Sequence, residues 1–255
     1  MTRKYPRNPH LVDIVDLNND SISYLKWGEP EEAYKLLSEA LDLLQLSSST
    51  QKPGQGIRMP TRNGYGFQWR DVGTACFSTV DSTADPRSDC AKSSTPPPST
   101  CVDTESHGFF LFHKGLSIQM PSKKDLRREV FCPFGLLWAL NYNLALTCHM
   151  LALGRSGIPR QNLLREALQL YDFVLSYLQQ QRPSLHFTIL LMAILNNKMF
   201  LCQDLSMEED ERCCFSVLKS LIDSTKKTNA SLSWWRHFYL NIFSLEQQGA
   251  LAAAA

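Results

Sequence analysis

The sequence lacks the short motifs that mark the common classes of catalytic and metal site. No two cysteines form a Cys-x-x-Cys pair, no glycine-rich phosphate loop follows an apolar run, and no Gly-x-Ser-x-Gly elbow occurs. We therefore expect no catalytic residue, no metal and no cofactor, and a protein that is not an enzyme. Two alternatives stay open: Cys90, Cys101, His107 and His113 gather a metal, or an enzyme of unrecognised type uses Cys and His residues.

A large net charge and an unbroken apolar run near the N-terminus are also lacking. The formal charge is +1, which gives no electrostatic reason to expect nucleic acid or an acidic membrane as the partner. Asp13, Asp16 and Asn18 interrupt the region in which a secretion signal needs an unbroken apolar run. The cysteines are then expected to be free thiols in a reducing compartment, and the expected location is intracellular, in the cytoplasm.

One stretch is long enough to span a membrane. Residues 130–153 contain no Asp, Glu, Lys or Arg. However, Pro133, Asn141, Asn143 and His149 interrupt this stretch, and its polar positions recur at helical spacing, which is typical of a helix packed between protein neighbours. We therefore predict a buried core helix and no membrane.

Apolar residues recur at steps of three and four along most of the chain, which predicts amphipathic helices joined as hairpins. The first hairpin covers residues 1–46, the second 129–181 and the third 182–228, and residues 229–255 form a closing helix and tail. The predicted fold is therefore all-α, with one domain overall.

Local signals predict where several helices begin and end. Gly28 suits the end of a helix and Pro30 the start of the next. Ser206 and Glu209 have the spacing of a capping box, which predicts that Ser206 starts the second helix of the third hairpin.

Residues 47–128 interrupt the helical pattern as an insertion rich in Ser, Pro and Gly. This composition buries too little apolar surface to offset its ordering entropy, so we expect partial disorder. Two aromatic islands, residues 65–69 and 109–118, are short as strands are. We expect them to pair as a small β-hairpin on the helical body; a mobile loop with two apolar spots is the alternative.

Superposing the hairpins in sequence reveals an internal repeat. An asparagine recurs at one register of the first helices: Asn19, Asn143, Asn197 and Asn241. A small, a large and another small or medium-sized residue recur on the second helices: Ala33, Leu37 and Ala40, then Ala167, Tyr171 and Val174, then Cys213, Val217 and Ser220.

This spacing resembles the tetratricopeptide repeat. The first hairpin carries residues at the intervals of that motif: Ser21, Tyr24, Gly28, Ala33, Leu37 and Ala40. The central hairpin matches at Ala145, Ala167 and Tyr171 if its connecting loop is about ten residues longer than that of the motif. The sequence of this hairpin also resembles an uncharacterised group of tetratricopeptide-like proteins of unicellular algae. The resemblance implies an α-α superhelix of three hairpins plus a closing helix, and no assigned activity.

The aligned asparagines are the candidate binding residues. An amide both donates and accepts, so asparagines along the first helices can hold the backbone of an extended peptide. We predict a non-catalytic interaction scaffold with a protein or peptide partner, and Asn143, His149, Asn197 and Asn241 as contacts. Two alternatives remain: each asparagine bonds the backbone of a neighbouring helix, or residues 109–118 fill the groove so that the protein is self-capped.

Overall fold

The computed structural model describes residues 10–49, 66–71, 111–119, 133–179, 185–229 and 233–254. Helices dominate these residues, which confirms the predicted all-α class. The helices are α1 (Leu11–Trp27), α2 (Pro30–Ser49), α3 (Pro133–Leu153), α4 (Gly157–Leu178), α5 (Leu185–Asp204), α6 (Glu208–Asn229) and α7 (Ser233–Ala254). Two short strands, β1 (Gly66–Asp71) and β2 (Lys114–Gln119), lie in the sequence between α2 and α3.

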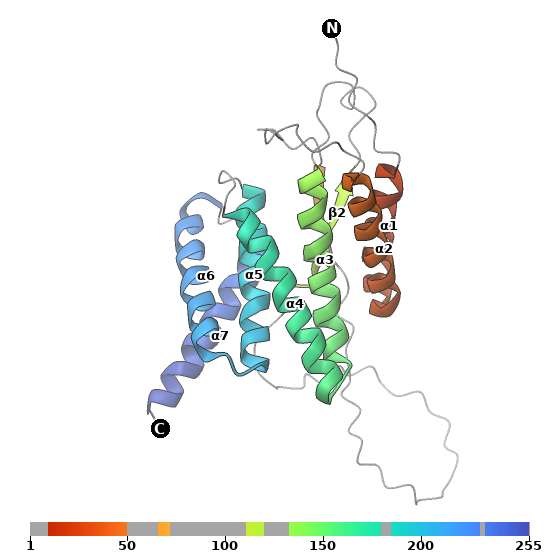
Figure 1. The fold of residues 1–255 in the computed structure, drawn as a ribbon. Coiled ribbons are helices and arrows are strands. Elements are labelled where there is room, and N and C mark those ends of the chain that lie inside the picture. The colour runs from red at the N-terminus through yellow and green to blue at the C-terminus, as the bar shows by residue number, and fades with distance from the viewer. Residues whose placement is uncertain are drawn as a thin grey trace, which may run out of the picture.

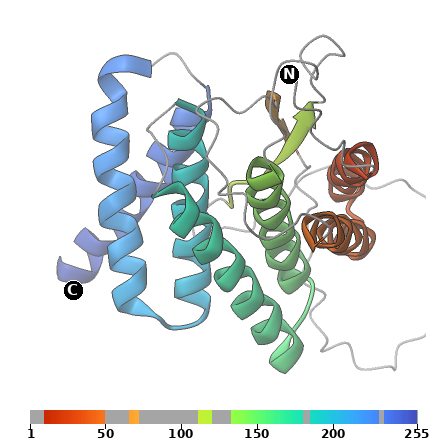
Figure 2. The ribbon, with the colours of Figure 1, turned by 45° about the horizontal axis from the view of Figure 1, so that its top comes forward.

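The helices stand side by side as pairs in chain order. α1 packs on α2, α3 on α4 and α5 on α6, while α2 also contacts α3 and α4 contacts α5 (Figure 1). α7 packs against α5 and α6 at the far end of the stack (Figure 2). Each pair therefore buries its apolar faces partly against the next pair, as stacked helical repeats do.

α3 is the central helix. Its segment Gly135–Leu153 is long and apolar enough to cross a membrane, yet 89% of that window is buried inside the protein. Leu136, Tyr142 and Leu146 have no exposed surface. The prediction of a buried core helix is therefore confirmed. A helix that protein covers on all sides needs no polar face toward solvent, which explains its long apolar stretch.

Two helices end at residues with a positive φ. Gly28 follows α1 with φ 79°, and hydrogen bonds from Gly28 N to Leu25 O and from Glu29 N to Tyr24 O close the helix. The predicted end at Gly28 and start at Pro30 are therefore confirmed.

The prediction that Ser206 starts α6 is wrong. Ser206 has φ 57°, and Ser206 N and Met207 N bond the carbonyls of Gln203 and Cys202, the same pattern that closes α1. Ser206 thus ends α5, and Met207 directly precedes α6. The two helices are so close in sequence that the termination geometry of the first takes the residue that would cap the second.

The central pair has longer helices rather than a longer loop. Only residues 154–156 separate α3 from α4. α4 begins at Gly157, ten positions before Ala167, whereas α2 begins at Pro30, three positions before Ala33. The extra residues of the central hairpin therefore continue the helical pattern, which is energetically favoured over an irregular loop with unpaired backbone groups.

The repeat register of α6 differs by one residue from the prediction. Cys213 and Ser220 are exposed and Val217 is 42% exposed, whereas Cys214 and Leu218 are buried. Both stripes have helical spacing, and the packing selects the stripe with the larger apolar side chains.

The two aromatic islands of the insertion contribute the two strands. β1 and β2 pair antiparallel, with Phe67 opposite Ile118 and Trp69 opposite Leu116. The expected pairing of the islands is therefore present. Of the predicted insertion, residues 47–49 belong to α2, and residues 50–65, 72–110 and 120–128, to which the expectation of partial disorder applies, lie outside the described residues.

Replacing Ala145 or Ala167 by Leu is expected to lower the free energy of unfolding by about 1–3 kcal/mol, because both side chains are fully buried and a longer one meets packed neighbours. Urea titration measures the change. Gln169→Leu, at an exposed position of α4, is the control and should change stability by less than about 0.5 kcal/mol. Equal stability of all variants would mean that α3 and α4 do not pack closely.

Candidate functional site

The aligned asparagines are buried polar side chains. Asn143, Asn197 and Asn241 have no exposed surface, although they stand on three different helices. A buried amide without partners costs free energy, so each must find a donor and an acceptor. Their partners define the site.

Three asparagines each bond both backbone groups of one residue in the segment 111–119, which we call the docked segment. Asn19 accepts from Ile118 N at 2.9 Å and donates to Ile118 O at 2.9 Å. Asn143 accepts from Leu116 N at 2.8 Å and donates to Leu116 O at 2.9 Å. Asn197 accepts from Phe112 N at 2.8 Å and donates to Phe112 O at 3.2 Å. We call these three side chains the asparagine clamp.

The clamp works because the docked segment is extended. In a strand the N–H and C=O of one residue point to the same edge, and successive residues point to opposite edges. The backbone N–H and C=O groups of Phe112, Leu116 and Ile118 therefore point toward the helices, whereas those of Gly115 and Ser117 point toward β1. One edge of β2 pairs with a strand, and the other edge pairs with side-chain amides that take the place of a strand.

The docked segment crosses the stack against the order of the chain. It begins beside α5, where Asn197 holds Phe112, and ends beside α1, where Asn19 holds Ile118 (Figure 2). It therefore links three helical pairs that are separated in sequence. The order of the clamp fixes the direction in which the segment runs.

A further set of polar side chains supports the clamp. Asn143 also donates to Asn18 Oδ1 at 2.8 Å, and Asn18 in turn donates to Leu116 O at 3.0 Å. At the other end Asn241 donates to Asn196 Oδ1 at 2.6 Å, and Asn196 donates to Asn197 Oδ1 at 3.2 Å. Asn18 also donates to Asn19 Oδ1 at 3.3 Å, so each clamp amide has a second polar partner that fixes its orientation toward the docked segment.

Two tyrosines complete the polar contacts. Tyr142 donates to Lys114 O at 3.0 Å, between the residues held by Asn143 and Asn197. Tyr171 on α4 accepts from Asn197 at 3.1 Å. Burial raises the pKa of both hydroxyls, so both stay protonated at any physiological pH.

The side chains of the docked segment are buried as deeply as its backbone. Phe112, Leu116 and Ile118 are 1–2% exposed and belong to the main core. The ring of Phe112 lies against Phe238 and His237 of α7, with centroids 4.8 and 5.4 Å apart. The segment is thus held by its backbone on one edge and by apolar contacts at alternate positions.

The four predicted contacts have three different roles. Asn143 and Asn197 bond the docked segment directly, and Asn241 acts through Asn196. The bonds of the clamp go to the insertion and not to the backbone of a neighbouring helix. His149 differs from its predicted role, because it stands six residues after Asn143 on α3 and therefore about 240° around the helix.

His149 lies instead where the ends of α4 and α5 meet. Burial lowers its pKa to about 4, while Asp204 acts in the opposite direction and Arg160 in the same direction. Arg160 and Asp204 form an ion pair with a 2.5 Å contact. Nδ1 of His149 has no hydrogen-bond partner among the described residues, so the ring is a neutral core side chain.

Several contributing residues were missed in the sequence. Asn19 was aligned in the repeat but not chosen as a contact, and Tyr171 was assigned to packing alone. Asn18 and Tyr142 carried no separate signal, because a tyrosine or asparagine in an apolar helix is usually part of the core. Asn19 could have been found from its position in the repeat, because it stands at the same register as the three asparagines that were chosen.

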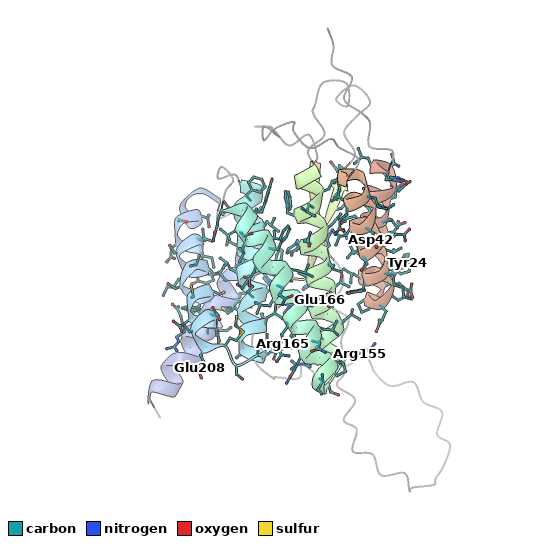
Figure 3. All side chains as sticks on the ribbon, in the orientation of Figure 1. Tyr24, Asp42, Arg155, Arg165, Glu166 and Glu208 are labelled. Carbon is teal, nitrogen blue, oxygen red and sulfur yellow. The ribbon has the colours of Figure 1, made fainter. Side chains whose placement is uncertain are left out.

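Other polar contacts tie the outer helices together. Tyr34 on α2 donates to Glu166 on α4 at 2.9 Å, and desolvation together with this carboxylate raises the Tyr34 pKa to about 12. Arg155 contacts Glu31 at 3.0 Å. Figure 3 labels Glu166 near the middle of the stack and Arg155 toward its lower end. These contacts join pairs and are not grouped around a reacting position.

Two neighbouring thiols have opposite pKa shifts. A hydrogen bond with Cys214 raises the pKa of Cys202, and the same bond lowers the pKa of Cys214. Lys198 lies nearby and pairs with Asp172. Among the described residues no group of three or more His, Cys, Asp or Glu side chains could hold a metal. Of the possible metal ligands in the insertion, Cys90, Cys101 and His107 lie outside the described residues.

Comparisons of the chain with known protein families, with curated proteins and with solved structures find no match. The resemblance to the tetratricopeptide repeat therefore stays a prediction.

Removing one clamp amide should destabilise the protein. Asn143→Ala deletes the partner of Leu116 N and one of the two partners of Leu116 O inside the core, so we expect a loss of about 1–3 kcal/mol in the free energy of unfolding. Asn162→Ala, at an exposed position of α4, is the matched control and should change it by less than about 0.5 kcal/mol. Chemical denaturation measures both. Similar values for the two variants would contradict the clamp.

His149 should make the protein sensitive to acid. Its pKa is near 6.5 when unfolded and about 4 when folded, so its contribution is complete above pH 6.5. The contribution is lost as the pH falls from 6.5 toward 4, roughly 3 kcal/mol in total. His149→Leu should flatten this dependence in urea titrations at a series of pH values. His10→Leu, at a half-exposed position, is the control and should keep the same pH dependence as the wild type. If His10→Leu flattened the pH dependence and His149→Leu did not, the assignment to His149 would be wrong.

Proposed function

We propose that this chain is a non-catalytic protein-interaction module with a tetratricopeptide-like superhelix, whose groove along the first helices takes an extended peptide. The asparagine clamp carries this proposal, because it holds both backbone groups of Phe112, Leu116 and Ile118. Backbone contacts of this kind accept any residue in an extended conformation, so they serve affinity and direction rather than sequence recognition.

The apolar positions of the docked segment supply the sequence preference. Phe112, Leu116 and Ile118 are buried, and Gly115 and Ser117 between them are buried as well, which leaves room for small residues only. A ligand of this groove is therefore an extended peptide with an aromatic residue, an aliphatic residue four positions later and another two positions after that. Small residues precede each aliphatic one.

The docked segment holds the groove until a competing peptide displaces it. A segment of the same chain competes at an effective concentration in the millimolar range, so an external peptide needs either high affinity or help in removing the segment. The protein is then both an interaction module and self-capped, because the groove is a binding site that a segment of the same chain occupies.

The test opens the groove and supplies the ligand separately. Leu116→Asp with Ile118→Asp places two carboxylates at positions with 1–2% exposure, which should expel the docked segment. A fluorescent peptide with the sequence of residues 109–120 should then bind this open variant at least about tenfold more tightly than it binds the wild type, in fluorescence anisotropy.

The asparagines are tested in the open variant. Adding Asn143→Ala and Asn197→Ala should weaken peptide binding by about tenfold or more for each clamp removed. Adding Asn162→Ala should leave it unchanged. Circular dichroism checks that each variant keeps its helices. A helical open variant that does not bind the peptide, or binding that ignores the two clamp substitutions, would refute the groove.

A further inference from the structure

Two thiols lie in contact where α5 packs on α6. Cys202 on α5 has no exposed surface, and Cys214 on α6 is 5% exposed. A hydrogen bond joins their side chains, and both are free thiols. A single buried cysteine usually serves as a small apolar side chain, but two thiols in contact can also react with each other. The asparagine clamp uses neither of them.

The direction of the two helices brings the sulfurs together. Residues 205–207 join α5 to α6, so the helices run side by side in opposite directions (Figure 1). Cys202 lies two residues before the end of α5, and Cys214 lies six residues after the start of α6. A helical side chain tilts toward the N-terminus of its own helix. The side chain of Cys202 therefore tilts away from the connection and that of Cys214 tilts toward it, so they converge.

The hydrogen bond makes the two thiols unequal. It lowers the pKa of Cys214 and raises the pKa of Cys202, so Cys202 donates and Cys214 accepts. Burial and Asp210 oppose ionisation of both thiols, and Asp172 also opposes that of Cys214. Lys198, one helical turn before Cys202, lowers the pKa of both thiols. The net effect on Cys214 is a lowered pKa, so Cys214 is the thiol that ionises first.

The other two described cysteines lack this arrangement. Cys148 on α3 bonds the carboxylate of Glu166, and burial together with this carboxylate raises its pKa. A thiol that stays protonated is a poor nucleophile. Cys213 is exposed and lies about 100° around α6 from Cys214, so it faces away from Cys202. The two serve as internal controls for the reactivity of the pair.

We propose that Cys202 and Cys214 form a dithiol that hydrogen peroxide oxidises to a disulfide, with Cys214 as the attacking thiol and Lys198 stabilising its thiolate. The site is separate from the asparagine clamp and does not rest on the peptide-binding proposal. The disulfide links α5 to α6 and restricts the third helical pair. In a reducing compartment it is transient, because dithiols reduce it again.

The oxidation takes two steps. The Cys214 thiolate attacks one oxygen of hydrogen peroxide, the O–O bond breaks, and the other oxygen leaves as hydroxide, which takes up a proton to form water. Cys214 is then a sulfenic acid. The sulfur of Cys202 attacks the sulfur of Cys214, the S–O bond breaks, and the hydroxyl leaves as a second water with the proton of the Cys202 thiol. The two thiols lose two electrons, and one peroxide is reduced to two waters.

Peptide mapping of the full chain without reduction tests the proposal. The reduced protein is treated with an equimolar amount of hydrogen peroxide, blocked with N-ethylmaleimide in denaturant and digested with trypsin. We expect a disulfide between the peptides of residues 199–212 and 213–219, which dithiothreitol reverses. Cys148 should be recovered as the alkylated thiol.

Serine variants assign the sulfurs. Cys213→Ser should keep the disulfide, because Cys213 faces away from Cys202. Cys202→Ser should stop the reaction at a sulfenic acid on Cys214, which dimedone traps. Circular dichroism checks that each variant keeps its helices, and the wild type and Cys213→Ser, with its exposed replacement, test the pair without altering the core.

The rate of oxidation tests the role of the lysine. Lys198→Met should slow disulfide formation at pH 7 by about threefold or more and raise the pH at which the rate is half-maximal, because the Cys214 thiolate loses a nearby cation. Lys198→Arg should restore the rate. Lys219→Met, at an exposed and ion-paired position of α6, is the matched control and should leave the rate unchanged.

Four results would each overturn the proposal. They are a wild type without the disulfide between the two peptides, loss of the disulfide in Cys213→Ser, a sulfenic acid trapped on Cys202 in Cys214→Ser but none on Cys214 in Cys202→Ser, and equal rates for the methionine variants of Lys198 and Lys219.

Discussion

The structure depends on the mutual satisfaction of two sets of buried polar groups. The docked segment brings one edge of extended backbone into the core, and the first helices bring asparagines that have no water to bond. Each set alone would cost free energy, because a buried donor or acceptor without a partner loses its hydration for nothing. Together they form three pairs of parallel bonds between 2.8 and 3.2 Å long. The segment and the asparagines therefore have to be explained together.

The same dependence explains why α3 has so little amphipathic character. A helix in a stack normally shows one apolar face toward its neighbours and one polar face toward solvent. α3 is covered by α2, α4 and the docked segment, so its asparagines and Thr147 are polar residues inside the protein. Thr147 donates to Asn143 O at 2.8 Å, which keeps it satisfied within its own helix. Polar residues on α3 are thus part of the interior rather than its boundary.

Local signals in the sequence were sufficient where one residue decides the structure. Gly28 and Pro30 predicted a helix end and a helix start, because a left-handed residue and a fixed φ act at single positions. The aligned asparagines were found by comparing registers, which needs only helical spacing. The same geometry places His149 away from the clamp, since it stands six residues after Asn143 and therefore on a different face of α3.

The remaining differences come from packing, which a single sequence does not contain. A serine such as Ser206 can cap the start of a helix, but here Ser206 adopts the left-handed conformation that ends α5. The stripes through Cys213 and Cys214 have equal helical spacing, and only the neighbouring helices select the second. The destination of the asparagine bonds also lies far away in the chain, because Asn197 and Phe112 are 85 residues apart. Contacts at this separation are set by the fold and carry no local signature.

The path of the docked segment has a consequence for how the protein folds. Stacked helical repeats usually fold by nearest-neighbour steps, so that one end can melt while the other persists. Here one short segment bonds α1, α3 and α5 simultaneously, and its contacts span large sequence separations. Loss of any one helical pair would release part of a segment that the other pairs also hold. The stack should therefore nucleate slowly and melt cooperatively, as proteins of high contact order do, although it is built almost entirely from helices.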